Sequence, residues 1–124
     1  DSQRVALLCA VLEKIVGLHL GGQDIFLNVV GGLDVDEPAV DLGVLLAIVS
    51  SFQNRALQKR TLVLGEVGLS GEIRPVAGEA SRLQEASRLG FQRAILPKKG
   101  SSEKLPGDLE LNRVANVAAA LDLL

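Results

Sequence analysis

The sequence has 124 residues, of which 48% are apolar and 23% charged, and its formal net charge is −2. This length and composition predict a single domain over residues 1–124, and no apolar run is long enough for a membrane span. One Cys and one His exclude an internal disulfide and the usual structural zinc site, and three Phe without Tyr or Trp exclude rows of base-stacking aromatic side chains.

The first half of the chain is predicted to hold two helices with a strand between them. Residues 3–18 place apolar side chains at helical spacing, and this helix is expected to end near the Gly-Gly pair at 21–22. Residues 24–30 are rich in strand formers, and the Gly-Gly pair at 31–32 lacks the ending of a phosphate loop and indicates a turn. Residues 38–52 begin with Pro and are apolar nearly all round, so this helix is expected to form the buried centre.

The second half alternates strands and helices, which is typical of the α/β class. The expected elements are a hairpin of strands 61–67 and 72–76, an amphipathic helix over 78–89, short strands at 93–96 and 109–111, and a last helix over 115–124.

Charge is divided unevenly along the chain. Residues 1–53 carry two basic and seven acidic side chains, whereas residues 54–104 carry ten basic and five acidic ones. Such asymmetry is suited to head-to-tail self-association or to a phosphate-binding face. Ordinary charged helix surfaces would give the same pattern, so the alternatives stay open at this point.

A motif in the second half carries a family resemblance. Residues 65–78 read Gly-Glu-Val-Gly-Leu-Ser-Gly-Glu-Ile-Arg-Pro-Val-Ala-Gly, and a helix and the sequence Arg-Ala-Ile-Leu-Pro follow. This order resembles the proteolytic domain of the Lon protease family. That family's other signature, Gly-Pro-Ser-Ala-Gly at a helix start, is matched in position by residues 37–41, where only the Pro is identical. The resemblance implies a Lon proteolytic-domain-like fold (ribosomal protein S5 domain 2-like), with a mixed sheet and packed helices.

The Lon resemblance also locates the residues that would perform catalysis. It places Ala39 at the position of the nucleophilic Ser and Ala80 at the position of the Lys that accepts its proton. A methyl group can neither attack a carbonyl nor accept a proton. Ser81 would point about 100° away from the Lys direction, and residues 50–51 lie about three turns beyond Ala39. No Lys lies between residues 60 and 97. We therefore expect no peptidase activity, and an active Ser-Lys peptidase is the last-ranked hypothesis.

Other chemically versatile side chains favour structural roles. His19 is a possible base, but a cation near a helix end is the commoner role. Cys9 falls on the apolar face of the first helix and is expected to pack as a small apolar side chain. The acidic residues after the Gly-Gly pair at 31–32 lack the Gly and the terminal Glu of a calcium loop. These acidic residues are Asp34, Asp36, Glu37 and Asp41. Glu37 and Asp41 are expected near the positive end of the helix over 38–52, where carboxylates are favoured.

Three longer stretches narrow the resemblance to the last domain of the RadA (Sms) family of bacterial DNA repair proteins. They are residues 24–32, 41–51 and 65–76. The resemblance implies a cytoplasmic, hexameric, DNA-dependent ATPase that acts with the RecA recombinase in recombination and branch migration after DNA damage. Its zinc finger and its ATPase, with their Zn, ATP and Mg, would belong to other domains. This chain is then expected to be a fragment of a longer protein with no cofactor of its own and no membrane partner.

Two hypotheses follow. In the first, the chain is a non-catalytic Lon-like scaffold that supports a homo-oligomeric ring. In the second, it is an electrostatic module for single-stranded or branched DNA that reads no sequence, because phosphate contacts carry no sequence information. The candidate DNA-binding residues are Arg55, Lys59, Arg60, Arg82, Arg88, Arg93, Lys98 and Lys99.

Overall fold

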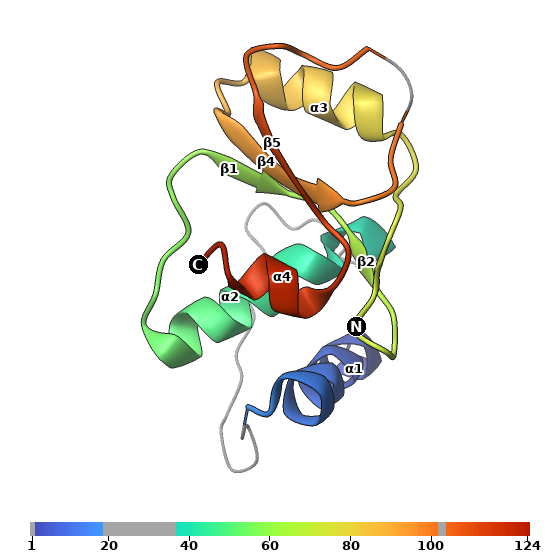
Figure 1. Ribbon diagram of the computed structural model, residues 1–124, viewed down its shortest axis with the longest axis vertical. Helices are drawn as coiled ribbons and strands as arrows, with labels where there is room; N and C mark the ends of the chain where they lie inside the picture. Colours follow the sequence, from blue (N-terminus) through green and yellow to red (C-terminus); the bar gives the residue numbers. More distant parts are fainter. Residues whose placement is uncertain (1, 19–36, 102–103) are drawn as a thin grey trace.

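The computed structural model describes residues 2–18, 37–101 and 104–124 (Figure 1). Within these ranges, no helix has both the length and the apolar character that crossing a bilayer requires. The elements are α1 (Ser2–Val11), the π-helical turn η1 (Leu12–Val16), the 3-10 turn η2 (Pro38–Val40), α2 (Asp41–Gln53), β1 (Thr61–Val63), β2 (Glu66–Val67), β3 (Ile73–Arg74), α3 (Glu79–Arg88), β4 (Arg93–Pro97), β5 (Glu110–Val114) and α4 (Val117–Leu121).

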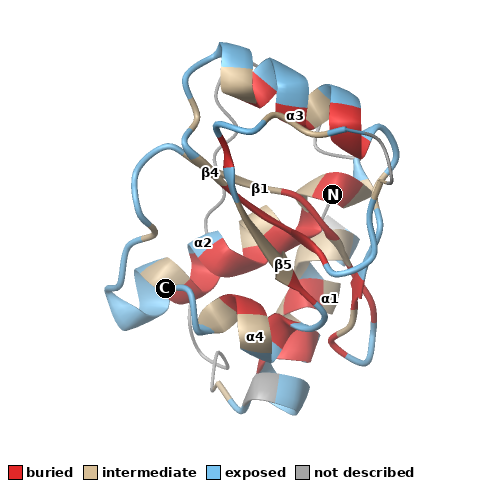
Figure 2. Ribbon diagram, turned by 45° about the horizontal axis from the view of Figure 1, so that its top comes forward, coloured by how far each residue is buried: buried red, intermediate tan, exposed pale blue. Residues whose placement is uncertain are grey.

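A small parallel sheet forms the middle layer. Its strand order is β1-β4-β5, and Thr61, Arg93 and Glu110 are aligned across it at the amino ends of the strands. The central strand β4 is buried from Ala94 to Pro97, as Figure 2 shows. Burial on both faces is what a parallel sheet requires, because helices or loops must cover each side.

The two faces of the sheet belong to separate apolar cores. On one face, Leu83 of α3 packs in a cluster with Ala94 and Leu96 of β4. On the other face, Ile95 of β4 joins the larger cluster that α1, α2 and α4 contribute to. Alternate residues of a strand point to opposite faces, so a single strand supplies both cores. The amphipathic helix expected over 78–89 is confirmed, and its apolar stripe faces the sheet.

Helix α2 is buried over most of its length, as its composition predicts. Leu42, Leu45, Leu46 and Val49 have no exposed surface. The last turn emerges from the core, and Phe52 is 44% exposed. The prediction of a buried central helix therefore holds for one face of α2 as far as Val49, but not for Ala47, which is exposed, or for the last turn.

Several expected boundaries are wrong, and glycine explains two of them. The first helical segment ends at Gly17, whose φ of 83° gives a left-handed cap, and not at residues 21–22. The strand expected over 61–67 is split, because the N–H of Gly65 donates to the carbonyl of Ala39 and its carbonyl accepts from Leu42, both at 3.0 Å. A Cβ at position 65 would also lie 2.8 Å from the side chain of Ile73, so only Gly fits this approach.

In place of the one mixed sheet that was expected, the described residues form two separate sheets. Among the described residues, parallel pairing is confined to β1, β4 and β5, and antiparallel pairing forms a separate ribbon of β2 and β3. The ribbon confirms the predicted hairpin only where residues 66–67 pair with 73–74, because residues 61–63 pair with β4 instead. The strand expected at 24–30 and the turn at 31–32 lie outside the described residues.

Candidate functional site

Ala39 lies in the 3-10 turn that leads into α2, and only 2% of its surface is exposed. Glu37, one residue before the Pro of this turn, accepts a hydrogen bond from the N–H of Ala39 at 3.3 Å. The bond between the Ala39 carbonyl and Gly65 fixes the turn to the connection between β1 and β2. The methyl group at this position is therefore held rigidly and is shielded from solvent.

Ala80 is the second residue of α3 and is 6% exposed. It lies at the wall of a half-open cavity of about 370 Å³ that residues 75–76, 78–81 and 100–101 line. Gly78 opens α3 with a φ of 69°, which favours Gly over any other residue. The lining includes Ser81 but neither Lys nor His.

An ion pair connects the segments that carry the two alanines. The guanidinium of Arg82, two residues after Ala80, lies 3.5 Å from Oε1 of Glu37, two residues before Ala39. Arg82 also donates to the carbonyl of Ala77 at 2.9 Å. The start of α3 and the turn before α2 are thus neighbours, as the Lon resemblance requires of its Ser and Lys positions.

The acidic side chain beside Ala80 is held in a buried ion pair. Glu79 is 5% exposed, and its carboxylate accepts from both terminal nitrogens of Arg113 at 3.0 and 3.1 Å and from the N–H of Ser101 at 2.7 Å. Burial alone would raise the pKa of Glu79, but hydrogen bonds from Arg113 and Ser101 outweigh it and lower that pKa below its ordinary value. The lowered pKa makes Glu79 a weak base, and its oxygens are engaged by Arg113 and Ser101, so it is unsuited to the proton transfer that the Lon resemblance assigns to position 80.

A second buried carboxylate, Asp41, anchors the other side of the site. Asp41 is 1% exposed and accepts from Arg4 through both carboxylate oxygens, with Nε to Oδ1 at 2.8 Å. The N–H of Val67 donates to the same carboxylate at 3.1 Å. Hydrogen bonding to Asp41 raises the pKa of Arg4 above its ordinary value. This pair fastens α1 to the start of α2, next to the turn that holds Ala39.

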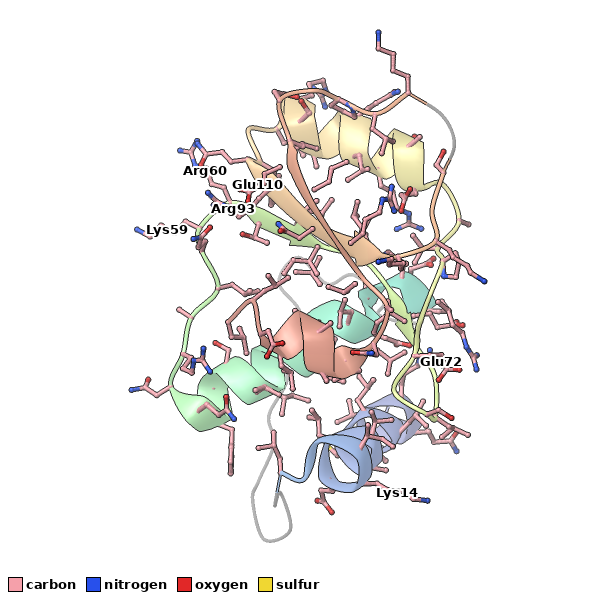
Figure 3. All side chains as sticks on the ribbon, viewed as in Figure 1. Lys14, Lys59, Arg60, Glu72, Arg93 and Glu110 are labelled. Carbon is pink, nitrogen blue, oxygen red and sulfur yellow. The ribbon has the colours of Figure 1, made fainter. Side chains whose placement is uncertain are left out.

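The candidate DNA-binding cations do not form one continuous surface. Lys59, Arg60 and Arg93 gather at the amino ends of β1 and β4 (Figure 3). We call these three residues the cation group. Lys98 and Lys99 follow the other end of β4, about 15 Å away for a five-residue strand. Arg82 and Arg88 lie on α3, and Arg55 follows α2.

Partners distinguish these cations further. Arg88 pairs with Glu85, and Arg55 donates to the carbonyl of Leu124. Arg93 donates to the carbonyl of Lys59 at 2.8 Å and lies 3.6 Å from Glu110. Lys59, Arg60, Lys98 and Lys99 make no ion pair within the described ranges. Their role in DNA binding stays a prediction.

The remaining candidates have structural surroundings where they are described. Cys9 is half-buried against the larger core, and burial raises the pKa of its thiol, so it fits the predicted packing role. Glu37 and Asp41 lie at the start of η2 and α2, the positive end of the long helix, as predicted. His19, Asp34 and Asp36 lie outside the described residues. Within the described part of the chain, no group of His, Cys, Asp or Glu is arranged to hold a metal.

The sequence did not reveal the two buried ion pairs. A single carboxylate at the start of an otherwise apolar helix is a signal for Asp41, although nothing in the pattern identifies Arg4 as its partner. Glu79 gives no such signal, because it stands among charged residues on an amphipathic helix. Arg113 lies on a strand in which Glu110 and Asn112 are also polar, so spacing does not single it out.

Comparison with known proteins identifies relatives over the whole chain. The family described as subunit ChlI of Mg-chelatase matches residues 4–100. The DNA repair protein RadA of Pseudomonas aeruginosa is 47% identical over 124 residues, which is 100% of this chain and 27% of that protein. RadA of Bacillus subtilis is 47% identical over 122 residues and RadA of Escherichia coli 44% over 123, again covering 27% of each relative. The chain thus spans about a quarter of the length of these relatives.

Proposed function

The chain belongs to the ChlI family, in the form carried by bacterial DNA repair proteins RadA, and on this premise we propose that it is a non-catalytic Lon-like scaffold within a longer DNA-repair ATPase. The observation that carries the proposal is the pair of buried alanines, Ala39 and Ala80, at the positions where a Lon-type peptidase needs a hydroxyl and an amine. Two methyl groups leave the fold intact and remove its chemistry.

Nothing in the neighbouring side chains replaces the missing dyad. Ser81 is exposed, and no Lys or His lines the cavity beside it. Among the described residues that line the cavity, the carboxylate is that of Glu79, and it is committed to Arg113. A serine without a base is a weak nucleophile, so the cavity is poorly suited to peptide hydrolysis.

The scaffold role rests on what the fold retains. The features that hold the fold together are present: the packing around α2, the glycine approach at position 65 and both buried ion pairs. The proposed assembly is a homo-hexameric ring in the bacterial cytoplasm, in which the whole protein acts with RecA in recombination and repair of DNA damage. A heterologous interface closes into a ring when its rotation permits, and unevenly distributed charge helps neighbours to orient.

No cofactor is assigned to this chain. ATP, Mg and Zn would serve the domains that the relatives carry beyond the matched quarter. The residues present do not fit them, because the sequence has one Cys and one His and no phosphate-loop ending after residues 31–32.

The scaffold proposal predicts concentration-dependent self-association without peptidase activity. Light scattering should give a mass that rises above the 13.1 kDa of one chain as concentration increases, and raising the salt concentration should weaken the association. Incubation with an unfolded protein substrate should yield no cleavage.

Two results would count against the scaffold proposal. One is a strict monomer at every concentration, together with an intact ring formed by a full-length relative that lacks this domain. The other is cleavage that is lost in a Ser81→Ala variant, which would restore the peptidase hypothesis.

A second function, electrostatic binding of single-stranded or branched DNA, is favoured by the cation group. Lys59 and Arg60 follow one another at the amino end of β1, and no described acidic residue pairs with them. The guanidinium of Arg60 lies beside Gly90, at the end of α3, and Arg93 stands next to it on β4. Three cations against one carboxylate, Glu110, leave this end of the sheet positive and able to accept phosphate groups.

Reversing two charges tests the DNA-binding function. A Lys59→Glu/Arg60→Glu variant is expected to bind single-stranded DNA more weakly, and the slope of log affinity against log salt should decrease by about 1.4, or 0.7 for each lost phosphate contact. Titration of a fluorescent oligonucleotide at several salt concentrations measures both quantities. The matched control is Lys98→Glu/Lys99→Glu at the opposite end of β4, which should have a smaller effect. Equal losses in both variants would show that the binding is not localised at the cation group.

A further inference from the structure

A second cavity, of about 150 Å³, adjoins the cation group. Arg93 belongs to both, since it starts β4 and lines the cavity. Leu57, Ile95 and Leu123 form apolar walls, and two of them, Leu57 and Ile95, pack in the larger core. The cavity therefore lies on the sheet face opposite α3, under the amino ends of the strands.

Strand register explains why polar groups converge here. Arg93 is aligned with Glu110, and Ile95 with Asn112 two residues further along. Residues two apart on a strand share a face, so all four side chains point to the same side of the sheet. Figure 3 shows Arg93 and Glu110 together at this end, with Lys59 and Arg60 beside them.

Several of these polar groups lack hydrogen-bond partners. Nε of Arg93 is buried and makes no hydrogen bond within the described residues; it lies 3.6 Å from Oε2 of Glu110, an ion-pair distance, while Nη1 of the same guanidinium donates to the carbonyl of Lys59. The side-chain amides of Asn112 and Gln58, which also line the cavity, make none within the described part of the chain. A buried donor without a hydrogen bond costs free energy, which applies to Nε of Arg93. Asn112 is half-buried and Gln58 is exposed, so their amides are open to solvent and can exchange water for a ligand.

The size and chemistry of the cavity fit one ring. A cavity of about 150 Å³ accommodates a single benzene-sized ring, and a purine, with two fused rings, is larger. Apolar walls can hold the faces of a base, while an amide, with both donors and an acceptor, matches its Watson–Crick edge. Lys59 and Arg60 stand where the attached phosphate would be neutralised.

We propose that this cavity receives one unstacked pyrimidine base, while the cation group binds the adjoining phosphate. The inference rests on the proposed DNA-binding function and extends it, because a base in a cavity adds a preference that phosphate contacts cannot give. It also supplies a way to hold a base without the aromatic side chains that the sequence lacks.

Two ligand pairs separate base recognition from phosphate binding. Thymidine monophosphate and deoxyribose phosphate both carry a phosphate, but only the first carries a base. An oligothymidylate and an abasic oligonucleotide of equal length form the second pair, with the same difference. In NMR titrations of the 124-residue chain, thymidine monophosphate should shift the signals of Asn112 and Leu123, and deoxyribose phosphate should not. The oligothymidylate should bind at least about fivefold more tightly than its abasic counterpart, the lower end of what a bidentate base contact contributes.

Variants assign that difference to the cavity. Asn112→Leu removes the amide at nearly constant volume and should abolish the preference for the oligothymidylate, without changing the affinity for the abasic strand. Leu57→Trp, which fills the cavity and removes no polar group, should do the same. Gln84→Leu removes an exposed amide from α3, on the other face of the sheet, and should leave the preference intact. Circular dichroism checks that each variant is folded.

The outcomes distinguish this inference from the function on which it rests. Equal affinity for the two strands, without shifts from thymidine monophosphate, would overturn the base cavity and leave the phosphate-binding surface standing. Shifts from thymidine monophosphate without any oligonucleotide binding would support the cavity and overturn the surface. A preference that persists in both Asn112→Leu and Leu57→Trp would place the base elsewhere and overturn the assignment.

Discussion

Replacing Arg4 with Met is expected to lower the free energy of unfolding by about 3–5 kcal/mol, because the substitution leaves a buried carboxylate without its counter-charge. Asp41 is 1% exposed and would keep only the N–H of Val67 as a hydrogen-bond donor among the contacts described. Chemical denaturation at neutral pH, followed by circular dichroism, measures the loss.

The same substitution at Arg74 is the matched control. Arg74 also pairs with carboxylates, Glu66 at 3.5 Å and Glu72 at 3.0 Å, but its side chain is 53% exposed. Water screens exposed ion pairs, so Arg74→Met should change the free energy of unfolding far less than Arg4→Met does. If Arg4→Met were as mild as Arg74→Met, the buried pair would not be what fastens α1 to α2.

The Arg4–Asp41 pair also shows where prediction from the sequence ends. Periodicity located α2 and α3, and glycine with strand formers located the hairpin and β4, because these signals are local along the chain. The split of the strand at Gly65 was missed, since it depends on backbone bonds to Ala39 and Leu42, more than twenty residues away. Pairings across that separation leave no periodic trace in one sequence.

For the same reason, the sequence located the two alanines of the candidate site but not the arrangement of its cations. Ala39 and Ala80 could be placed by motif, since each stands in a contiguous signature, and the ion pair between Glu37 and Arg82 brings their segments together. The candidate DNA-binding cations were grouped by charge along the sequence alone, and the fold distributes them over both ends of the sheet, α3 and the end of α2. Only Arg93, Lys59 and Arg60 converge, because β1 and β4 are adjacent and parallel.

Both buried pairs flank the two alanines. Arg4 and Asp41 hold the helix that begins after Ala39, while Glu79 and Arg113 join the start of α3 to β5 beside Ala80. Ionic contacts in these places fix the relative positions of helices and strands. A scaffold needs that rigidity as much as an enzyme does, so their presence is compatible with the proposed non-catalytic role.

Removing Arg113 should change both the free energy of unfolding at neutral pH and the way in which that free energy depends on pH. In the wild type the pKa of Glu79 is lower in the folded state than its ordinary value of 4.5, so its contribution is present above that value and is lost as the pH falls through the folded pKa. In Arg113→Met the buried carboxylate loses its cation, and burial should raise its pKa above the ordinary value. Ionised Glu79 then destabilises the variant at neutral pH, by about 3 kcal/mol.

The wild type and Arg113→Met should therefore differ in the sign of the contribution that Glu79 makes to the pH dependence of stability. Between pH 7 and 5 the wild type should keep the contribution of this pair, whereas Arg113→Met should recover part of its lost stability as Glu79 takes up a proton. Denaturation midpoints at a series of pH values measure both. The double variant Glu79→Gln/Arg113→Met removes the titrating group, so its recovery should vanish. A single variant whose deficit stays constant from pH 7 to 5 would mean that Arg113 acts only through its bond to the carbonyl of Pro97, at 2.9 Å, and not through the charge of Glu79.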